Sequence, residues 1–253
     1  MEIGKDTFIN IRSFEKKYAD YSGNYMDSPF MFDFQVRTRK VSKQKDEEPE
    51  TILTDEYNPV ASERFKEIAE RMIYSKGPDT IIPDIMGFLD DVDGKKAADV
   101  VFAIDATGSM KDDIDKLKTE LVPSLLEKYA DNPNVRIGLL FYRDYGDNFK
   151  YHSLPVKMYD FTNDFSAFNK NLNSLVIKGK EGGDVAEAVY EALYASAEFF
   201  NWAENSYRKV ILIGDAEPHP YPRGSKKYSK EFVSKIAREK NVKIDAILLP
   251  SNK

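Results

Sequence analysis

The chain has 253 residues, which is enough for one large domain or for one domain with an appendage. Its 37 Lys and Arg against 43 Asp and Glu give a formal net charge of −6, which argues against a nucleic-acid-binding protein. With no Cys and only 2 His, thiolate metal sites, catalytic Cys and His-rich sites are excluded or disfavoured, so any chemistry must rest on carboxylates, hydroxyls and backbone.

Residues 1–97 form the less regular part of the chain and hold most of its excess negative charge. Residues 7–12 and 30–37 alternate apolar with polar side chains, which predicts two half-buried strands. Residues 59–74 place apolar side chains near helical spacing, and Gly77-Pro78 ends the predicted helix. A short helical segment is expected over residues 81–89. We therefore expect residues 1–97 to be an N-terminal extension and linker with two strands and a helix, whose role the sequence does not reveal.

From residue 98 onward, short apolar runs alternate with helical patterns. Residues 98–104, 135–142 and 209–214 read as fully buried strands, and residues 242–249 as a final strand. Pro155 makes residues 152–161 an edge strand. Helices are predicted over residues 111–129, 164–175, 185–202 and 229–240. This order predicts an α/β, Rossmann-like domain over residues 98–253, with a mostly parallel central sheet and helices on both faces.

Oxygen-bearing side chains follow the buried strands of this predicted sheet. Asp105, Thr107 and Ser109 come directly after the first buried strand, Asp184 precedes the long helix, and Asp215 follows the third buried strand. Function in such sheets gathers beyond the carboxyl ends of the strands, so these groups should converge. Hard cations such as Mg²⁺ take oxygen ligands of this kind. The sequence therefore predicts a divalent-cation site at this edge.

Four further polar residues should border that site. Arg143 and Asp144 follow the second buried strand, and Glu217 and His219 lie in the Pro-flanked loop after Asp215. We expect them at the rim, where they are placed to contact a partner. A surface ion pair is the plainer interpretation of Arg143 and Asp144, and an ordinary loop position that of Glu217 and His219.

The strings DATGSM, EGGDVAEAV and ILIGDAEPHP, which carry Asp105, Thr107, Ser109, Asp184 and Asp215, resemble a bacterial-type branch of the von Willebrand factor type A domain with its metal-ion-dependent adhesion site. The resemblance covers about residues 98–249. It implies a bound Mg²⁺ or Mn²⁺, with Ca²⁺ less suited, and a non-catalytic role in binding a protein or ligand. In the best-known members, an acidic side chain of the partner completes the metal coordination.

Two departures from the family pattern have consequences. Adhesive members usually have Thr where this chain has Asp184, so three carboxylates would face the ion. We therefore expect tighter metal binding and weaker recruitment of an acidic partner group. The family also continues past residues 242–249 with a helix and a last strand. Either the chain is trimmed or an N-terminal segment supplies that cover.

Two alternatives remain open: a Mg²⁺-dependent hydrolase or phosphotransferase, and a purely structural metal site. The haloacid-dehalogenase-like pattern needs a second Asp where this chain has Thr107, and neither GxGxxG after the first buried strand nor GxxxxGK[ST] occurs. No run is long enough to span a membrane, and residues 1–12 lack the apolar region of a signal peptide. The resemblance favours an extracytoplasmic place, in the envelope or at the surface, over the cytoplasm.

Overall fold

The computed structural model describes residues 9–12, 31–34, 56–93, 95, 97–129, 132, 134–182, 185–220 and 228–251. The chain divides into two compact units, Met1–Thr51 and Ile52–Lys253. In the first unit, strands β1 (Ile9–Arg12) and β2 (Met31–Phe34) pair antiparallel, with Ile9 opposite Phe34. Both strands fall within the segments predicted to be strands.

The second unit is built on a six-stranded sheet in the order β3-β8-β7-β4-β5-β6. All neighbouring strands run parallel except β6, which is antiparallel to β5 at the edge. The predicted edge strand is therefore confirmed. The strands are β3 (Arg71–Tyr74), β4 (Ala98–Asp105), β5 (Val135–Tyr142), β6 (Val156–Thr162), β7 (Tyr207–Gly214) and β8 (Val242–Leu248).

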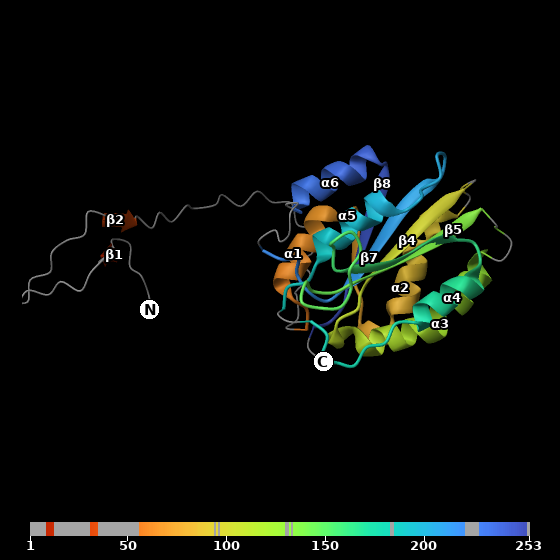
Figure 1. Cartoon of the computed structure of the whole chain (residues 1–253), viewed down its shortest axis with the longest axis horizontal. Helices are drawn as coiled ribbons and strands as arrows, with labels where there is room; N and C mark the ends of the chain where they lie inside the picture. Colours follow the sequence, from red (N-terminus) through yellow and green to blue (C-terminus); the bar gives the residue numbers. More distant parts are fainter. Residues whose placement is uncertain are drawn as a thin grey trace, which may run out of the picture. The chain divides into compact units, whose positions relative to one another are not determined.

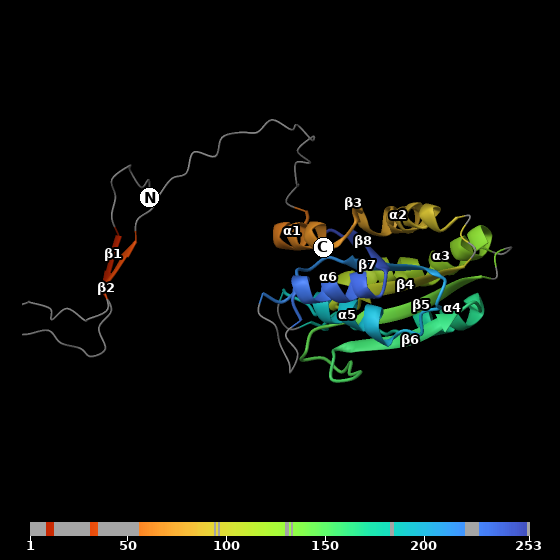
Figure 2. The same ribbon diagram turned by 90° about the horizontal axis from the view of Figure 1, so that it is seen from above.

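Helices cover both faces of this sheet, as the alternation of elements predicted (Figures 1 and 2). One apolar core joins the sheet to α2 (Ile81–Phe88), α3 (Lys111–Tyr129) and α4 (Phe165–Asn173). The other joins the opposite face to α1 (Pro59–Ile68), α5 (Val189–Phe199) and α6 (Lys230–Glu239). The central strand β4 is buried along its whole length because both faces are covered. No helix in the described ranges is both long and apolar enough to cross a membrane.

The helix predicted over residues 59–74 is wrong in its second half. Helix α1 ends at Ile68, Ala69 adopts an extended conformation, and the Glu70 N–H donates to the Ile244 carbonyl (2.7 Å). Residues 71–74 then pair with β8 as strand β3, with Met72 and Ile73 packed against opposite cores. Pairing with a strand that is distant in sequence decides the conformation of residues 71–74. A short apolar run does not by itself distinguish a strand from the end of a helix.

Strand β3 forms the edge of the sheet beside β8. The segment after β8 also contacts the segment before α1, because the Ser251 N–H donates to the Glu56 carbonyl (2.8 Å). Residues that precede β4 in sequence therefore supply a helix and a strand next to β8. The boundary expected at residue 97 falls inside the compact unit Ile52–Lys253.

The amino-terminal half of the sheet buries several charges, and they are paired. Asp99 in β4 accepts two hydrogen bonds from Arg136 in β5 (2.7 and 2.8 Å). Lys209 in β7 is fully buried and lies 2.8 Å from Asp245 in β8 and 2.5 Å from Asp91. Arg71 in β3 also bonds Asp245. These pairs join β4 to β5, and they join β3, β7 and β8 to one another and to the segment after α2.

Candidate metal-binding site at the carboxyl edge

The carboxyl ends of β4 and β7 lie side by side at the point where the chain leaves the sheet toward opposite faces. Helix α3 follows β4 on one face, and α6 follows β7 on the other. Ligands of open α/β sheets bind at such a switch point. Asp105 is the last residue of β4, and Asp215 comes directly after β7, so the fold brings these two predicted site residues together.

Asp105 is fully buried, and only one of its oxygens is paired. Its Oδ1 accepts hydrogen bonds from the Thr107 N–H (3.0 Å) and the Thr107 hydroxyl (2.8 Å). Its Oδ2 has no hydrogen-bond partner in the described structure. A buried carboxylate oxygen without a partner is unfavourable, so this atom is suited to bind a ligand.

Thr107 and Ser109 belong to the turn between β4 and α3. The Thr107 and Ser109 hydroxyls lie 3.4 Å apart, and the Gly108 N–H donates to the Glu181 carbonyl (3.0 Å). Thr107 is buried, whereas Ser109 is exposed. The turn therefore presents two neutral oxygen donors beside Asp105, as predicted from their spacing.

Gly214, the last residue of β7, allows the site to be compact. A Cβ at this position would clash with the hydroxyl of Tyr142 and lie 3.3 Å from Asp105 Cβ. The Tyr142 hydroxyl donates to the Ile213 carbonyl (3.3 Å). The close approach of β4, β5 and β7 at this edge requires glycine.

Glu187 is a buried carboxylate of this edge that the sequence analysis did not predict as a site residue. It precedes α5, which begins at Val189 rather than at residue 185. Its backbone N–H donates to the Glu217 carbonyl (2.8 Å), and its carbonyl accepts from the His219 N–H (3.2 Å). These bonds to the loop after β7 explain the later start of the helix. They also place Glu187 next to the Asp215 loop.

Burial and neighbouring carboxylates raise the pKa of two side chains at this edge, Asp105 and Glu187. Burial first, and then the charge of Asp215, raise the pKa of Asp105 to about 8. Burial, followed by the charges of Asp105, Asp144, Asp147 and Asp215, raises the pKa of Glu187 to about 10. Negative charge is therefore concentrated here, and a bound cation would relieve the repulsion.

Arg143, which was expected to border the site, is buried and is not half of a surface ion pair. Only 4% of Arg143 is exposed, its Nε donates to the Ala106 carbonyl (2.7 Å), and its Nη2 donates to the Val176 carbonyl (3.1 Å). Its guanidinium also stacks over the Phe149 ring. Arg143 thus holds the turn after β4 against the chain that leads out of α4.

The other three rim residues also make internal contacts. Asp144 and His219 are both buried, with His219 Nε2 2.9 Å from Asp144 Oδ1. The Glu217 carboxylate accepts a hydrogen bond from the Asn58 side chain, which also caps α1. His219 and Asp144 are therefore buried against each other, and neither is among the residues that line the pocket at this edge.

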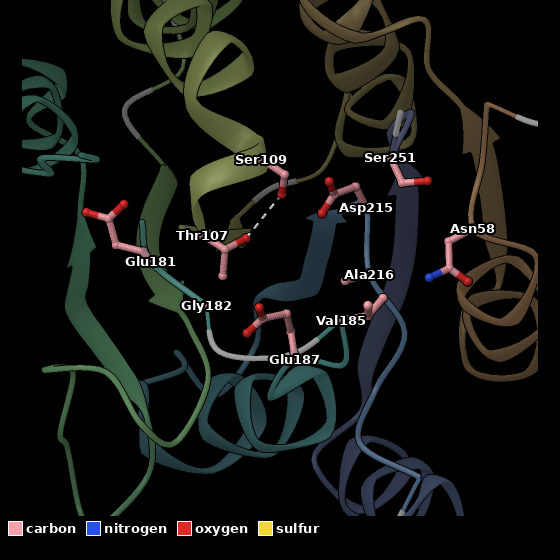
Figure 3. Close-up of a pocket in the computed structure, with 10 residues that line it drawn as sticks. All are labelled: Asn58, Thr107, Ser109, Glu181, Gly182, Val185, Glu187, Asp215, Ala216 and Ser251. Carbon is pink, nitrogen blue, oxygen red and sulfur yellow. Dashed lines mark hydrogen bonds between the residues drawn. The ribbon is translucent and has the colours of Figure 1, made fainter. Parts of the chain in front are cut away.

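A pocket of about 280 Å³ opens above these groups (Figure 3). In the figure, Ser109 and Asp215 face each other on one side, and Glu187 points in from the opposite side. The volume lies below the roughly 300–1,000 Å³ typical of pockets for drug-sized ligands. It suits an ion and one small group. The lining residues are Asn58, Thr107, Ser109, Glu181, Gly182, Val185, Glu187, Asp215, Ala216 and Ser251.

The donor set of this pocket is compatible with a hard divalent cation. Thr107, Ser109 and Asp215 line the pocket, and Asp105 is fully buried next to Thr107, so together they supply the carboxylate and hydroxyl oxygens that Mg²⁺ and Mn²⁺ prefer. Asp184 lies outside the described residues. Within the described part of the chain, no three His, Cys, Asp or Glu side chains are grouped so as to hold a metal ion. A site here must therefore include hydroxyl and water ligands.

A model of the von Willebrand factor type A domain matches residues 99–248, which is more than half of the chain. The chain belongs to the von Willebrand factor type A domain family. The matched range begins inside β4 and ends with β8, so it contains the whole predicted site and excludes α1, β3 and α2. A comparison with curated protein sequences gives no significant match.

Solved structures with a similar fold are distant in sequence. The pilus adhesin SpaC of Lactobacillus rhamnosus GG is 14% identical, with a TM-score of 0.43 over 60% of this chain and 24% of the adhesin. BatB of Bacteroides thetaiotaomicron is 18% identical, with a TM-score of 0.37 over 62% of this chain and 92% of BatB. The chain thus spans about a quarter of the adhesin. Identities this low do not transfer a partner or an activity.

Proposed function

We propose that this type A domain is a non-catalytic binding module whose divalent cation, Mg²⁺ or Mn²⁺ before Ca²⁺, is held at the carboxyl edge in the manner of a metal-ion-dependent adhesion site of the bacterial-type branch. The proposed metal residues are Asp105, Thr107, Ser109, Asp184 and Asp215. The observation that carries the proposal is the buried, unpartnered Oδ2 of Asp105 beside two hydroxyls at the switch point of the sheet.

The chemistry of the site supports binding rather than turnover. The ion supplies a positive centre that attracts an oxygen anion. The chain contributes the carboxylates that hold the ion, the turn that fixes Thr107 and Ser109, and the Arg143 clamp beneath that turn. We propose a protein partner that offers one acidic side chain, as the family resemblance implies, and the pocket of about 280 Å³ has room for an ion, its water ligands and such a side chain.

Thermal melting with and without metal tests the proposal. At a Mg²⁺ concentration about 100 times the dissociation constant, linkage stabilises the fold by about 2.7 kcal/mol, on the order of 5–10 °C in melting temperature. Asp105→Asn should abolish this shift. Asp115→Asn, an exposed carboxylate on α3, should leave it unchanged. An equal Mg²⁺ shift in both variants would contradict the proposed site.

Phosphatase and nucleotidase assays with Mg²⁺ separate this function from a hydrolase. We expect no turnover. Robust turnover that disappears in Asp105→Asn would overturn the non-catalytic role while leaving the metal site in place. A metal-dependent melting shift with no partner that responds to metal would favour a purely structural ion.

A further inference from the structure

The position of Glu187 is fixed by the loop that carries Asp215. Residues Glu187 and Pro218 form an isolated parallel bridge, and backbone hydrogen bonds join Glu187 to Glu217 and His219 on either side of it. Glu187 therefore cannot move away from the edge without disturbing the turn after β7. Its side chain starts from a fixed point at the wall of the pocket.

The Glu187 carboxylate is buried without a full set of partners. Only 3% of the residue is exposed, and its Oε2 has no hydrogen-bond partner in the described structure. Its Oε1 packs over Gly182, where an added Cβ would lie 3.0 Å from it and 3.5 Å from Thr107 Cγ2. Gly182 therefore lies between the Glu187 carboxylate and Thr107. Figure 3 shows the Glu187 carboxylate pointing into the pocket.

Glu191, about one helical turn farther along the chain, is a buried carboxylate that accepts a hydrogen bond, as buried carboxylates usually do. Glu191 is 2% exposed, and its Oε1 accepts a hydrogen bond from the Tyr145 hydroxyl (2.9 Å). Two glutamates of similar burial therefore differ in what satisfies them. A buried charge is normally paired or coordinates a metal, and the charges that act on Glu187 come from Asp105, Asp144, Asp147 and Asp215.

We propose that Glu187 belongs to the site of the divalent cation and is bound to the ion through one water molecule, because Glu187, Asp105 and Asp215 are not grouped closely enough in the described structure to hold an ion by themselves. This inference rests on the proposed function, and it adds a residue to the set predicted from Asp105, Thr107, Ser109, Asp184 and Asp215. Three segments that the described structure brings to one pocket then contribute to the metal site: the turn after β4, the segment before α5 and the loop after β7.

Titration of the full-length, metal-stripped protein with Mn²⁺ by calorimetry tests the assignment. We expect Glu187→Gln to weaken Mn²⁺ binding about tenfold or more, in the range found when a residue that supports a metal site is lost. Glu191→Gln, the matched control, should bind Mn²⁺ like the wild type, because its amide still accepts from Tyr145. Glu187→Asp keeps the charge on a shorter side chain and should bind with intermediate affinity.

Melting in EDTA separates a ligand from a structural residue. Without metal, Glu187→Gln should melt no lower than the wild type, because a neutral amide is no more costly to bury among the neighbouring carboxylates than the glutamate is. A weaker affinity together with a lower melting temperature in EDTA would indicate a structural role and overturn the inference. Wild-type affinity in Glu187→Gln, with binding lost in Asp105→Asn, would overturn the inference alone. No Mn²⁺ binding by the wild type would overturn the proposed function as well.

Discussion

The two ends of the central sheet both bury charged side chains, but they surround them differently. Toward the amino ends of the strands, Asp99 bonds Arg136, and Asp245 lies between Lys209 and Arg71. At the carboxyl edge, Asp105 and Glu187 each have one buried oxygen with no hydrogen-bond partner among the residues that the structure describes. The pKa of Asp99 is lowered, because its hydrogen bonds outweigh the effect of burial, whereas the pKa of Asp105 is raised to about 8.

This difference separates charges that serve the fold from charges that serve a ligand. Breaking a buried ion pair by removing one partner destabilises a protein strongly. The amino end of the sheet, where the charges are paired, should therefore be sensitive to mutation. The unpaired end should be indifferent to loss of charge, or even stabilised by it, until a cation is present. The predictions below test this contrast.

The largest effect is expected from Lys209→Met at the paired end. The substitution removes the cation between Asp91 and Asp245 and leaves Asp245 with Arg71 alone. The free energy of unfolding in urea should fall by about 3–5 kcal/mol. The double variant Lys209→Met, Asp245→Leu should recover part of that loss. A fall below about 1 kcal/mol would show that this end is not held by its ion pairs.

Asp99→Asn should show a smaller loss that depends on pH. Asp99 accepts hydrogen bonds from Arg136, Ser206 and the Ala203 N–H, and charge-assisted bonds of this kind contribute about 1.5–3 kcal/mol. Because the folded-state pKa is lowered, this stability is present above the unfolded pKa of about 3.9 and is lost as pH falls through the folded value. The free energy of unfolding of the variant should therefore be well below that of the wild type at pH 7 and close to it at pH 3. Equal differences would contradict the assignment.

Asp105→Asn should behave in the opposite way in metal-free protein. The folded-state pKa of Asp105 is about 8, so the folded protein retains the proton that the unfolded chain releases near pH 3.9. In EDTA, the free energy of unfolding of the wild type should fall as pH rises between these values. The variant lacks the titrating group, so its free energy of unfolding should not show this fall. At pH 6 we expect the variant to be more stable by up to about 3 kcal/mol, and at pH 4 to match the wild type. A variant less stable than the wild type at pH 6 would contradict this.

Asp184→Thr removes one of the carboxylates proposed to bind the ion and should have the smallest effect. With one carboxylate fewer, Mg²⁺ affinity should fall about tenfold, or 1.4 kcal/mol, because the ion loses an attractive charge. A short acidic peptide used as a probe should then bind the loaded domain more tightly. Calorimetry measures both affinities. A rise in Mg²⁺ affinity would show that Asp184 does not contribute its charge to the ion.

The core of the fold was predictable because its signals are local. Strands β4, β5, β7 and β8 are apolar runs that can only be buried, and Asp105, Thr107, Ser109 and Asp215 occur where those strands end. A parallel sheet brings such ends to one edge, so strand order along the chain was enough to predict that they converge.

The remaining features depend on contacts that no local pattern records. Strand β3 is a strand because β8 offers it hydrogen bonds, so its sequence was read as the end of a helix. Arg143 was expected at the surface, but the carbonyls that it binds are contributed by loops distant in sequence. Glu187 looked like part of a helix start, and its place in the pocket follows from the bonds to residues 217 and 219.

The central claim is that the carboxyl edge of this type A domain holds a divalent cation and that the amino-terminal ion pairs do not. Crystals of the full chain grown with Mn²⁺, with data collected at the manganese absorption edge, test it most directly. The account predicts one anomalous peak in the pocket lined by Thr107, Ser109, Glu187 and Asp215. A map with no peak there, or with its peak elsewhere in the molecule, would contradict it.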